Sequence, residues 1–145
     1  MRVALISFFM IFSLQIEAKE LKTITLKEFK SGKNYAFNDQ IGKKKMVINF
    51  WASWCTSCIE ELPLLHALQE KSDQSKVVFL AINSGEKGNK IKKFLKRYDF
   101  KYLILEDPSK SVADMFGVDN LPQTIILDEK GEVIYRGNRP PVKLP

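Results

Sequence analysis

The sequence predicts one α/β domain built on a mixed β-sheet flanked by helices, in which some strands run parallel and others antiparallel. Two observations predict this class. Short apolar segments typical of strands alternate with amphipathic segments of helical spacing, and the chain finishes with two strand-like segments joined by a turn. Its 145 residues, 45% hydrophobic and 28% charged, suit a single domain large enough to bury a core.

The predicted elements begin with an N-terminal β-hairpin, formed by residues 22–26 and 35–37 around a turn at 31–33. Further strands are expected at residues 46–50, 77–82 and 102–105, with helices at 56–71 and 89–98 between them. A shorter helix is expected at 108–116, with Asp107 as its N-cap, Pro108 at its first position and Gly117 as its stop. A closing hairpin is predicted from residues 123–127 and 132–136.

The only two cysteines of the chain, Cys55 and Cys58, are separated by two residues and follow the apolar run 46–50. A disulfide across so short a loop stabilises far less than the roughly 3 kcal/mol expected for a 15-residue loop, which weakens a purely structural interpretation. A closed zinc site needs about four Cys or His ligands, whereas the chain offers these two and His66. The pattern therefore favours a dithiol that cycles between reduced and oxidised states.

Cys55 falls at the predicted turn from strand to helix, where unpaired N–H groups and the helix dipole favour a thiolate. Cys58 lies one turn further along and is expected to be less exposed. We therefore expect Cys55 to be the attacking nucleophile and Cys58 to be the resolving thiol.

The segment 49–58, with Pro63 later in the same helix, resembles the active-site segment of thioredoxin-fold proteins of the TlpA/ResA-like branch. A second segment, 117–128, resembles the part of these proteins that carries a cis-proline, so that Pro122 is expected to be cis and to lie beside the dithiol. The resemblance covers roughly residues 43–137. It implies a thioredoxin fold and an extracytoplasmic thiol-disulfide oxidoreductase, of which several serve cytochrome c maturation.

Three further residues are assigned roles on this basis. Trp54, next to Cys55, is expected to shield the sulfur and, with Leu121 and Pro122, to contact substrate. Thioredoxins proper carry a buried aspartate where this chain has Asn49. The loop 82–87 resembles one that supplies a glutamate in TlpA/ResA-like proteins, so Glu86 is expected to be the acid/base group, with a pKa raised by partial burial. The alternative is that Glu86 is one more surface charge.

The end of the chain departs from the family pattern. Thioredoxin folds normally finish with a helix over one face of the sheet, but only nine residues follow Arg136 and three of them are prolines. We expect that helix to be missing. Either the sequence is a truncated product, or a partner or second copy covers the exposed face.

Residues 1–18 read as a secretory signal peptide or N-terminal anchor that precedes a domain at 19–145. Arg2 supplies the positive region, residues 3–14 the apolar region, and Ala18 a small residue at a cleavage point. This predicts a periplasmic or otherwise extracytoplasmic protein, soluble after cleavage or anchored by the segment.

The net charge of +6 raises the possibility of nucleic-acid binding, but lysines around Ile91 and Phe94 follow the spacing of the polar face of an amphipathic helix. No nucleic-acid partner is therefore expected. Attraction to an acidic partner or to anionic lipid stays open.

The expected function is reduction of disulfides in exported polypeptides, with recharging by a membrane electron donor. Thr56 and Ser57 lack the histidine that oxidising members carry between their cysteines, which favours the reductase over a disulfide-forming oxidase. A non-enzymatic copper carrier or adaptor is the other alternative. No metal and no cofactor beyond the redox-active Cys55–Cys58 disulfide is expected, and the sequence does not predict the oligomeric state.

Overall fold

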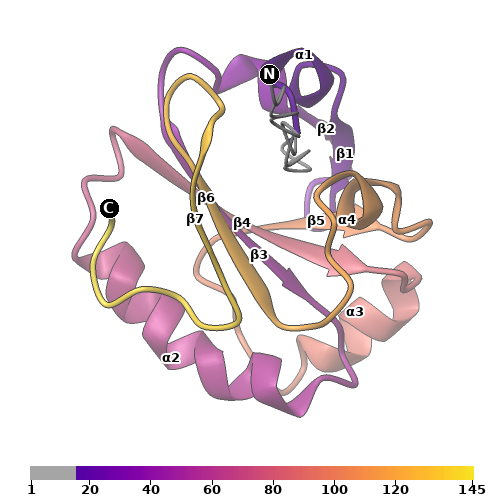
Figure 1. Cartoon of the computed structure of the whole chain (residues 1–145). Coiled ribbons are helices and arrows are strands. Elements are labelled where there is room, and N and C mark those ends of the chain that lie inside the picture. The colour runs from indigo at the N-terminus through magenta and orange to yellow at the C-terminus, as the bar shows by residue number, and fades with distance from the viewer. Residues whose placement is uncertain (1–15) are drawn as a thin grey trace, which may run out of the picture.

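A seven-stranded mixed sheet forms the centre of the protein, with strand order β2-β1-β5-β4-β3-β6-β7 (Figure 1). The computed structural model describes residues 16–145. The strands are β1 (Thr25–Glu28), β2 (Asn34–Ala36), β3 (Lys45–Trp51), β4 (Val77–Ser84), β5 (Leu103–Asp107), β6 (Gln123–Leu127) and β7 (Val133–Gly137). The helices are α1 (Ala18–Leu21), α2 (Thr56–Glu70), α3 (Gly88–Phe94) and α4 (Ser111–Met115), with a 3-10 helix, η1 (Phe37–Asp39).

The directions of the strands confirm the predicted class. β3 and β5 both run parallel to β4, which lies between them, whereas β6 runs antiparallel to β3. Both predicted hairpins are present, as the antiparallel pairs β1–β2 and β6–β7. The sheet is therefore mixed, and β3 lies inside it between a parallel and an antiparallel neighbour.

The apolar alternation along β3 divides the core into two layers. Val47 and Trp51 join a cluster with residues of α2 and α3, such as Leu65 and Phe94, on one face of the sheet. Phe50 and its same-face neighbours join a second cluster on the other face, to which α4 contributes Val112 and Ala113. Figure 1 shows α2 and α3 along the same side of the sheet. Burial on both faces makes β3 a rigid base for the turn that follows it.

The predicted helix at 108–116 begins later than expected. β5 continues its pairing with β4 through Asp107, opposite Ser84, and α4 starts only after a turn in which Lys110 has a φ of 61°. The Asp107 carboxylate still accepts hydrogen bonds from the N–H groups of Val112 and Ala113, at 3.1 and 2.9 Å. It caps α4 from the end of the strand rather than from the position directly before the helix.

Gly117, in the left-handed region with a φ of 63°, follows α4 as predicted, and its N–H donates to Asp114. The other predicted elements are present with shifted bounds, and α3 ends at Phe94 rather than at residue 98.

The expected absence of a C-terminal helix holds for the residues that the structure describes: β7 is the last regular element. The segment 138–145 instead runs back beside α2 (Figure 1), where Leu144 packs against the cluster that contains Leu68. Lys45 Nζ donates to the Pro145 carbonyl at 3.0 Å, and the Tyr135 hydroxyl donates to the Arg139 carbonyl at 2.6 Å. The chain's own tail therefore contributes cover to this face.

Residues 1–15 of the predicted signal or anchor segment lie outside the described residues. Ala18, the predicted cleavage point, is the first residue of α1, and Leu21 of the same helix is fully buried. Across 16–145, no helix combines the length and apolar character needed to span a membrane.

Candidate active site

The dithiol lies at the connection between the end of β3 and the start of α2. After Trp51 the chain turns at Ala52–Trp54, with the Cys55 N–H donating to the Ala52 carbonyl at 3.1 Å. Cys55 is then the N-cap of α2, with the extended backbone (φ −87°, ψ 100°) typical of that position. A buried strand thus delivers the first cysteine to the N-terminal end of a 15-residue helix, as predicted.

Cys55 and Cys58 form a disulfide with their Cα atoms 5.3 Å apart. The expected difference in exposure between them is wrong, because the two residues are 5% and 4% exposed. The helix terminus distinguishes them instead. The Cys58 N–H donates to Cys55 Sγ at 3.2 Å, and in the reduced protein the same group favours a thiolate on Cys55.

The second matched segment lies next to the dithiol turn in the sheet. The Leu121–Pro122 peptide bond is cis, as predicted. Gln123 pairs with Phe50 in the antiparallel β3–β6 ladder, so the next step of this register places Pro122 opposite Trp51, at the strand end that leads to Cys55. Leu121 is half-buried, whereas Trp54 is 70% exposed directly beside Cys55. These positions suit an apolar rim around a largely buried disulfide.

Glu86 anchors the active-site turn. Its carboxylate accepts hydrogen bonds from the Ser53 N–H at 2.7 Å, from the Ser53 hydroxyl at 2.6 Å and from Asn83 Nδ2 at 2.9 Å. Burial raises the pKa of Glu86, but these hydrogen bonds, together with the charge of Lys90, outweigh burial and hold the pKa below its usual range. The predicted increase in its pKa is therefore wrong, because three donors converge on the charged form.

A second carboxylate, which the sequence interpretation missed, has the environment expected of an acid/base group. Glu61 lies on α2 three residues after Cys58, is 5% exposed, and its Oε2 atom has no hydrogen-bond partner within residues 16–145. Burial raises the pKa of Glu61 to about 7, with an opposing effect from Arg139. On a helix, residues three apart lie on the same face, with Cβ atoms about 5–6 Å apart.

One sequence signal points to Glu61. The buried positions of α2 are Cys58, Glu61, Leu62, Leu65 and Leu68, a helical stripe in which one member is a carboxylate. A charged residue in an apolar stripe is uncommon without a partner or a function.

Two further polar residues, Asn49 and His66, have partners of their own within residues 16–145. Asn49 is buried in β3 and donates to Thr124 Oγ1 at 3.4 Å. His66, midway along α2, packs edge-on against Tyr102 with ring centroids 5.8 Å apart, and burial and the charge of Lys101 lower its pKa. In the part of the chain that the structure describes, no three His, Cys, Asp or Glu side chains are grouped to hold a metal ion.

Comparisons with known proteins agree with this geometry. Residues 16–143 match the family model Redoxin. The chain is 31% identical over 115 residues to thiol-disulfide oxidoreductase ResA of Bacillus thuringiensis subsp. konkukian (strain 97-27), covering 79% of this chain and 60% of that relative. It is 38% identical over 119 residues to thioredoxin-like protein YneN of Bacillus subtilis (strain 168), covering 81% and 68%.

Among solved structures, the exposed lipoprotein thioredoxin Etrx1 of Streptococcus pneumoniae strain TIGR4 superposes with a TM-score of 0.67 at 30% identity. The superposition covers 79% of this chain and 87% of that one, which agrees with the expected thioredoxin fold. The chain spans about 60% of the length of the ResA relative.

Proposed function

This chain belongs to the Redoxin family, in its TlpA/ResA-like branch, and we propose that it is a thiol-disulfide oxidoreductase that reduces disulfides in polypeptides outside the cytoplasm. One observation carries the proposal. Cys55 is the N-cap of α2, is bonded to Cys58, and accepts the Cys58 N–H on its sulfur.

The reaction starts from the reduced protein. The Cys55 thiolate attacks one sulfur of a substrate disulfide, forms a mixed disulfide, and releases the other substrate sulfur, which takes up a proton. Cys58 then loses its proton and attacks Cys55 Sγ. The second substrate sulfur leaves as a thiol, so that the substrate gains two electrons and Cys55–Cys58 becomes the disulfide.

Glu61 is proposed as the group that accepts the Cys58 proton. Its place three residues after Cys58, its burial and its unpartnered oxygen support this role. A carboxylate with a pKa of about 7 is ionised in a useful fraction near neutral pH and still basic enough to take a proton. Glu86, held by three donors, is proposed as a positioning residue for the turn that carries Cys55.

The limited stabilisation of the Cys55 thiolate supports the reducing direction. A helix dipole contributes about 0.3–1 kcal/mol at an exposed site and up to about 2 kcal/mol at a buried one such as that of Cys55. A two-electron couple moves by about 30 mV for every 1.4 kcal/mol, so this effect alone does not carry the site from about −270 mV, the value of thioredoxin, to about −120 mV, the value of DsbA.

Two features support a location outside the cytoplasm: the apolar run 3–14 after Arg2, and similarity to Etrx1, which is named an exposed lipoprotein. In such a compartment the oxidised protein needs a membrane electron donor, whose dithiol reduces the Cys55–Cys58 disulfide to two thiols and is itself oxidised to a disulfide. Exported polypeptides with disulfides, such as an apocytochrome c, are the proposed substrates.

The reduction potential of the dithiol tests the proposal. Tryptophan fluorescence or thiol labelling is followed across a glutathione or dithiothreitol series, with a potential near that of thioredoxin expected. A potential above about −160 mV contradicts the reductase and favours the disulfide-forming oxidase.

A further inference from the structure

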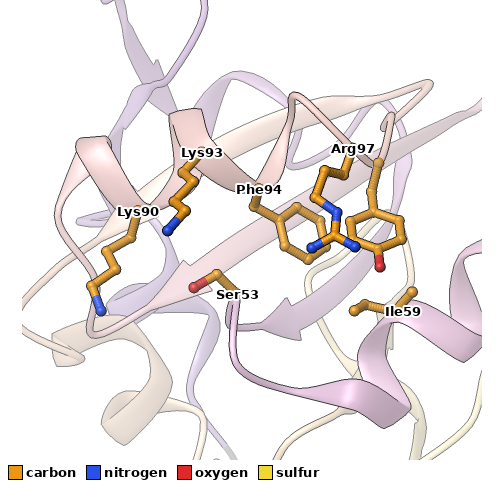
Figure 2. A pocket seen from close by; sticks show the side chains of 7 residues that line it. Ser53, Ile59, Lys90, Lys93, Phe94 and Arg97 are labelled. Carbon is orange, nitrogen blue, oxygen red and sulfur yellow. The ribbon is translucent and has the colours of Figure 1, made fainter.

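A groove of about 300 Å³ lies beside the active-site turn (Figure 2). Ser53 and Ile59, which flank the dithiol in sequence, form one side of it. The other side is α3 and the residues just after it, through Lys90, Lys93, Phe94, Arg97 and Tyr98. The groove therefore opens next to the cysteines rather than at a distant surface.

The rim of this groove is positively charged. Lys90, Lys93 and Arg97 are exposed, and their spacing places them along one side of the helical segment. Within residues 16–145, none of the three is in an ion pair, since the two ion pairs of this region involve Lys76 and Lys101. The neighbouring carboxylate, Glu86, interacts with the charge of Lys90 but is buried and hydrogen-bonded to Ser53, so Lys93 and Arg97 supply the rim charge that is available to a ligand.

The floor of the groove is apolar. Phe94 is 7% exposed, Ile59 and Tyr98 are half-buried, and the three side chains belong to or pack against the core cluster under α2. The guanidinium carbon of Arg97 lies 5.8 Å from the centroid of the Tyr98 ring. A ligand that fits has both an apolar body and negative charges.

The surface continues past Trp54. A second hollow, of about 390 Å³, shares Lys90 with the groove and is also lined by Trp54 and Lys87. α3 ends at Phe94, but the Tyr98 N–H donates to the Phe94 carbonyl at 3.1 Å and continues the helical path. A helical rise of 1.5 Å per residue from Lys90 to Arg97 gives roughly 10 Å, about the length of three extended residues.

We propose that this groove binds an acidic, extended segment of the disulfide-containing polypeptide, with its Asp or Glu side chains on Lys90, Lys93 and Arg97. The inference rests on the proposed function and adds to it a class of substrate, one in which a short acidic segment lies close in sequence to the reacting cysteine. The concave shape, the apolar floor and the position next to the dithiol favour a peptide over a lipid surface, which cannot enter the groove.

Peptide disulfides that differ only in charge test the proposal. Three peptides carry one reacting disulfide flanked by three Glu, three Gln or three Lys residues, and kcat/KM is measured with the reduced protein. The acidic peptide is expected to react about tenfold faster than the basic one at low salt, through KM, with the preference falling as salt approaches about 0.5 M.

A matched pair of variants locates the effect. Lys93→Gln combined with Arg97→Gln is expected to remove most of the acidic-to-basic ratio. The control combines Lys43→Gln with Lys71→Gln. Lys43 precedes the start of β3 and Lys71 follows the end of α2, so both exposed charges lie at the ends of these elements away from the dithiol, and their removal is expected to keep the ratio. Two outcomes contradict the proposal that the groove binds an acidic segment: equal reactivity of the three peptides with the wild-type protein, or an equal loss of the acidic-to-basic ratio in both double variants.

Binding separates this proposal from the activity. A fluorescent acidic peptide without cysteine is titrated with the oxidised protein and its Lys93→Gln/Arg97→Gln variant, and weaker binding to the variant supports the groove even if no exchange occurs. Failure to reduce a small neutral disulfide contradicts the proposed function alone. If the protein binds phosphatidylglycerol vesicles and shows no preference for the acidic peptide, the peptide-binding role of the groove is contradicted and the basic residues are assigned to a lipid surface.

Discussion

Glu86 accepts two hydrogen bonds from Ser53, one from the backbone N–H at 2.7 Å and one from the hydroxyl at 2.6 Å. This pair ties the loop after β4 to the turn that follows β3, two residues before Cys55. The position of the nucleophile therefore depends on a carboxylate 31 residues away in the chain.

Glu86→Gln is expected to destabilise the oxidised protein by about 1–3 kcal/mol at pH 7, because an amide offers one acceptor oxygen and leaves a Ser53 donor unpaired. The measurement is the free energy of unfolding in urea. Since the pKa of Glu86 is lowered by folding, its contribution is present above the ordinary value near 4.5 and is lost as pH falls through the lower, folded value. Glu60→Gln, at an exposed position, is the control and should change stability by less than about 0.5 kcal/mol. Equal effects of the two substitutions contradict the anchoring role.

Glu61→Gln is expected to have the opposite pH dependence. The pKa of Glu61 is raised from 4.5 to about 7, so the unfolded chain ionises first and the wild-type protein loses stability as pH rises between these values. The free energy of unfolding of the variant should not fall in this way. Relative to that of the wild type, it should therefore increase by about 1–3 kcal/mol between pH 4.5 and pH 8. Urea unfolding across this range checks the difference, with Glu60→Gln again as control. Parallel pH profiles of wild type and Glu61→Gln exclude a raised pKa at this site.

Glu61→Gln also tests proton transfer. If Glu61 takes the Cys58 proton, closure of the Cys55–Cys58 disulfide should slow by about 10–100-fold, and the rise of its rate with pH around 7 should disappear. Stopped-flow fluorescence of the decay of a preformed mixed disulfide on Cys55 measures this step. An unchanged rate and pH profile would return Glu61 to a structural role.

Cys58→Ser is expected to accumulate mixed disulfides with substrate through Cys55, whereas Cys55→Ser is not. The reason is the Cys58 N–H at 3.2 Å from Cys55 Sγ, at the N-terminus of α2. Non-reducing electrophoresis and mass spectrometry identify the trapped species. Trapping through Cys58 in Cys55→Ser would reverse the assignment of nucleophile and resolving thiol.

Local patterns were sufficient for most elements of the fold. The apolar run before the cysteines became β3, the helical segment after them became α2, and the predicted closing hairpin became β6 and β7. The bounds that differed depend on partners distant in the sequence. Asp107 is the clearest case, since pairing with β4 keeps it in a strand while its side chain caps a helix that starts later.

The spacing of Cys55 and Cys58 and their place between strand and helix were sufficient to predict a redox dithiol, because a helix terminus acts on the residues of its own first turn. The roles of the two glutamates did not follow from the sequence, because a carboxylate's pKa is set by burial and by donors that folding gathers from several segments. Glu86 accepts hydrogen bonds from Ser53, 33 residues away in the chain, and is held in its charged form. Glu61 is buried with no hydrogen-bond partner for its Oε2 atom within residues 16–145, and its pKa rises to about 7.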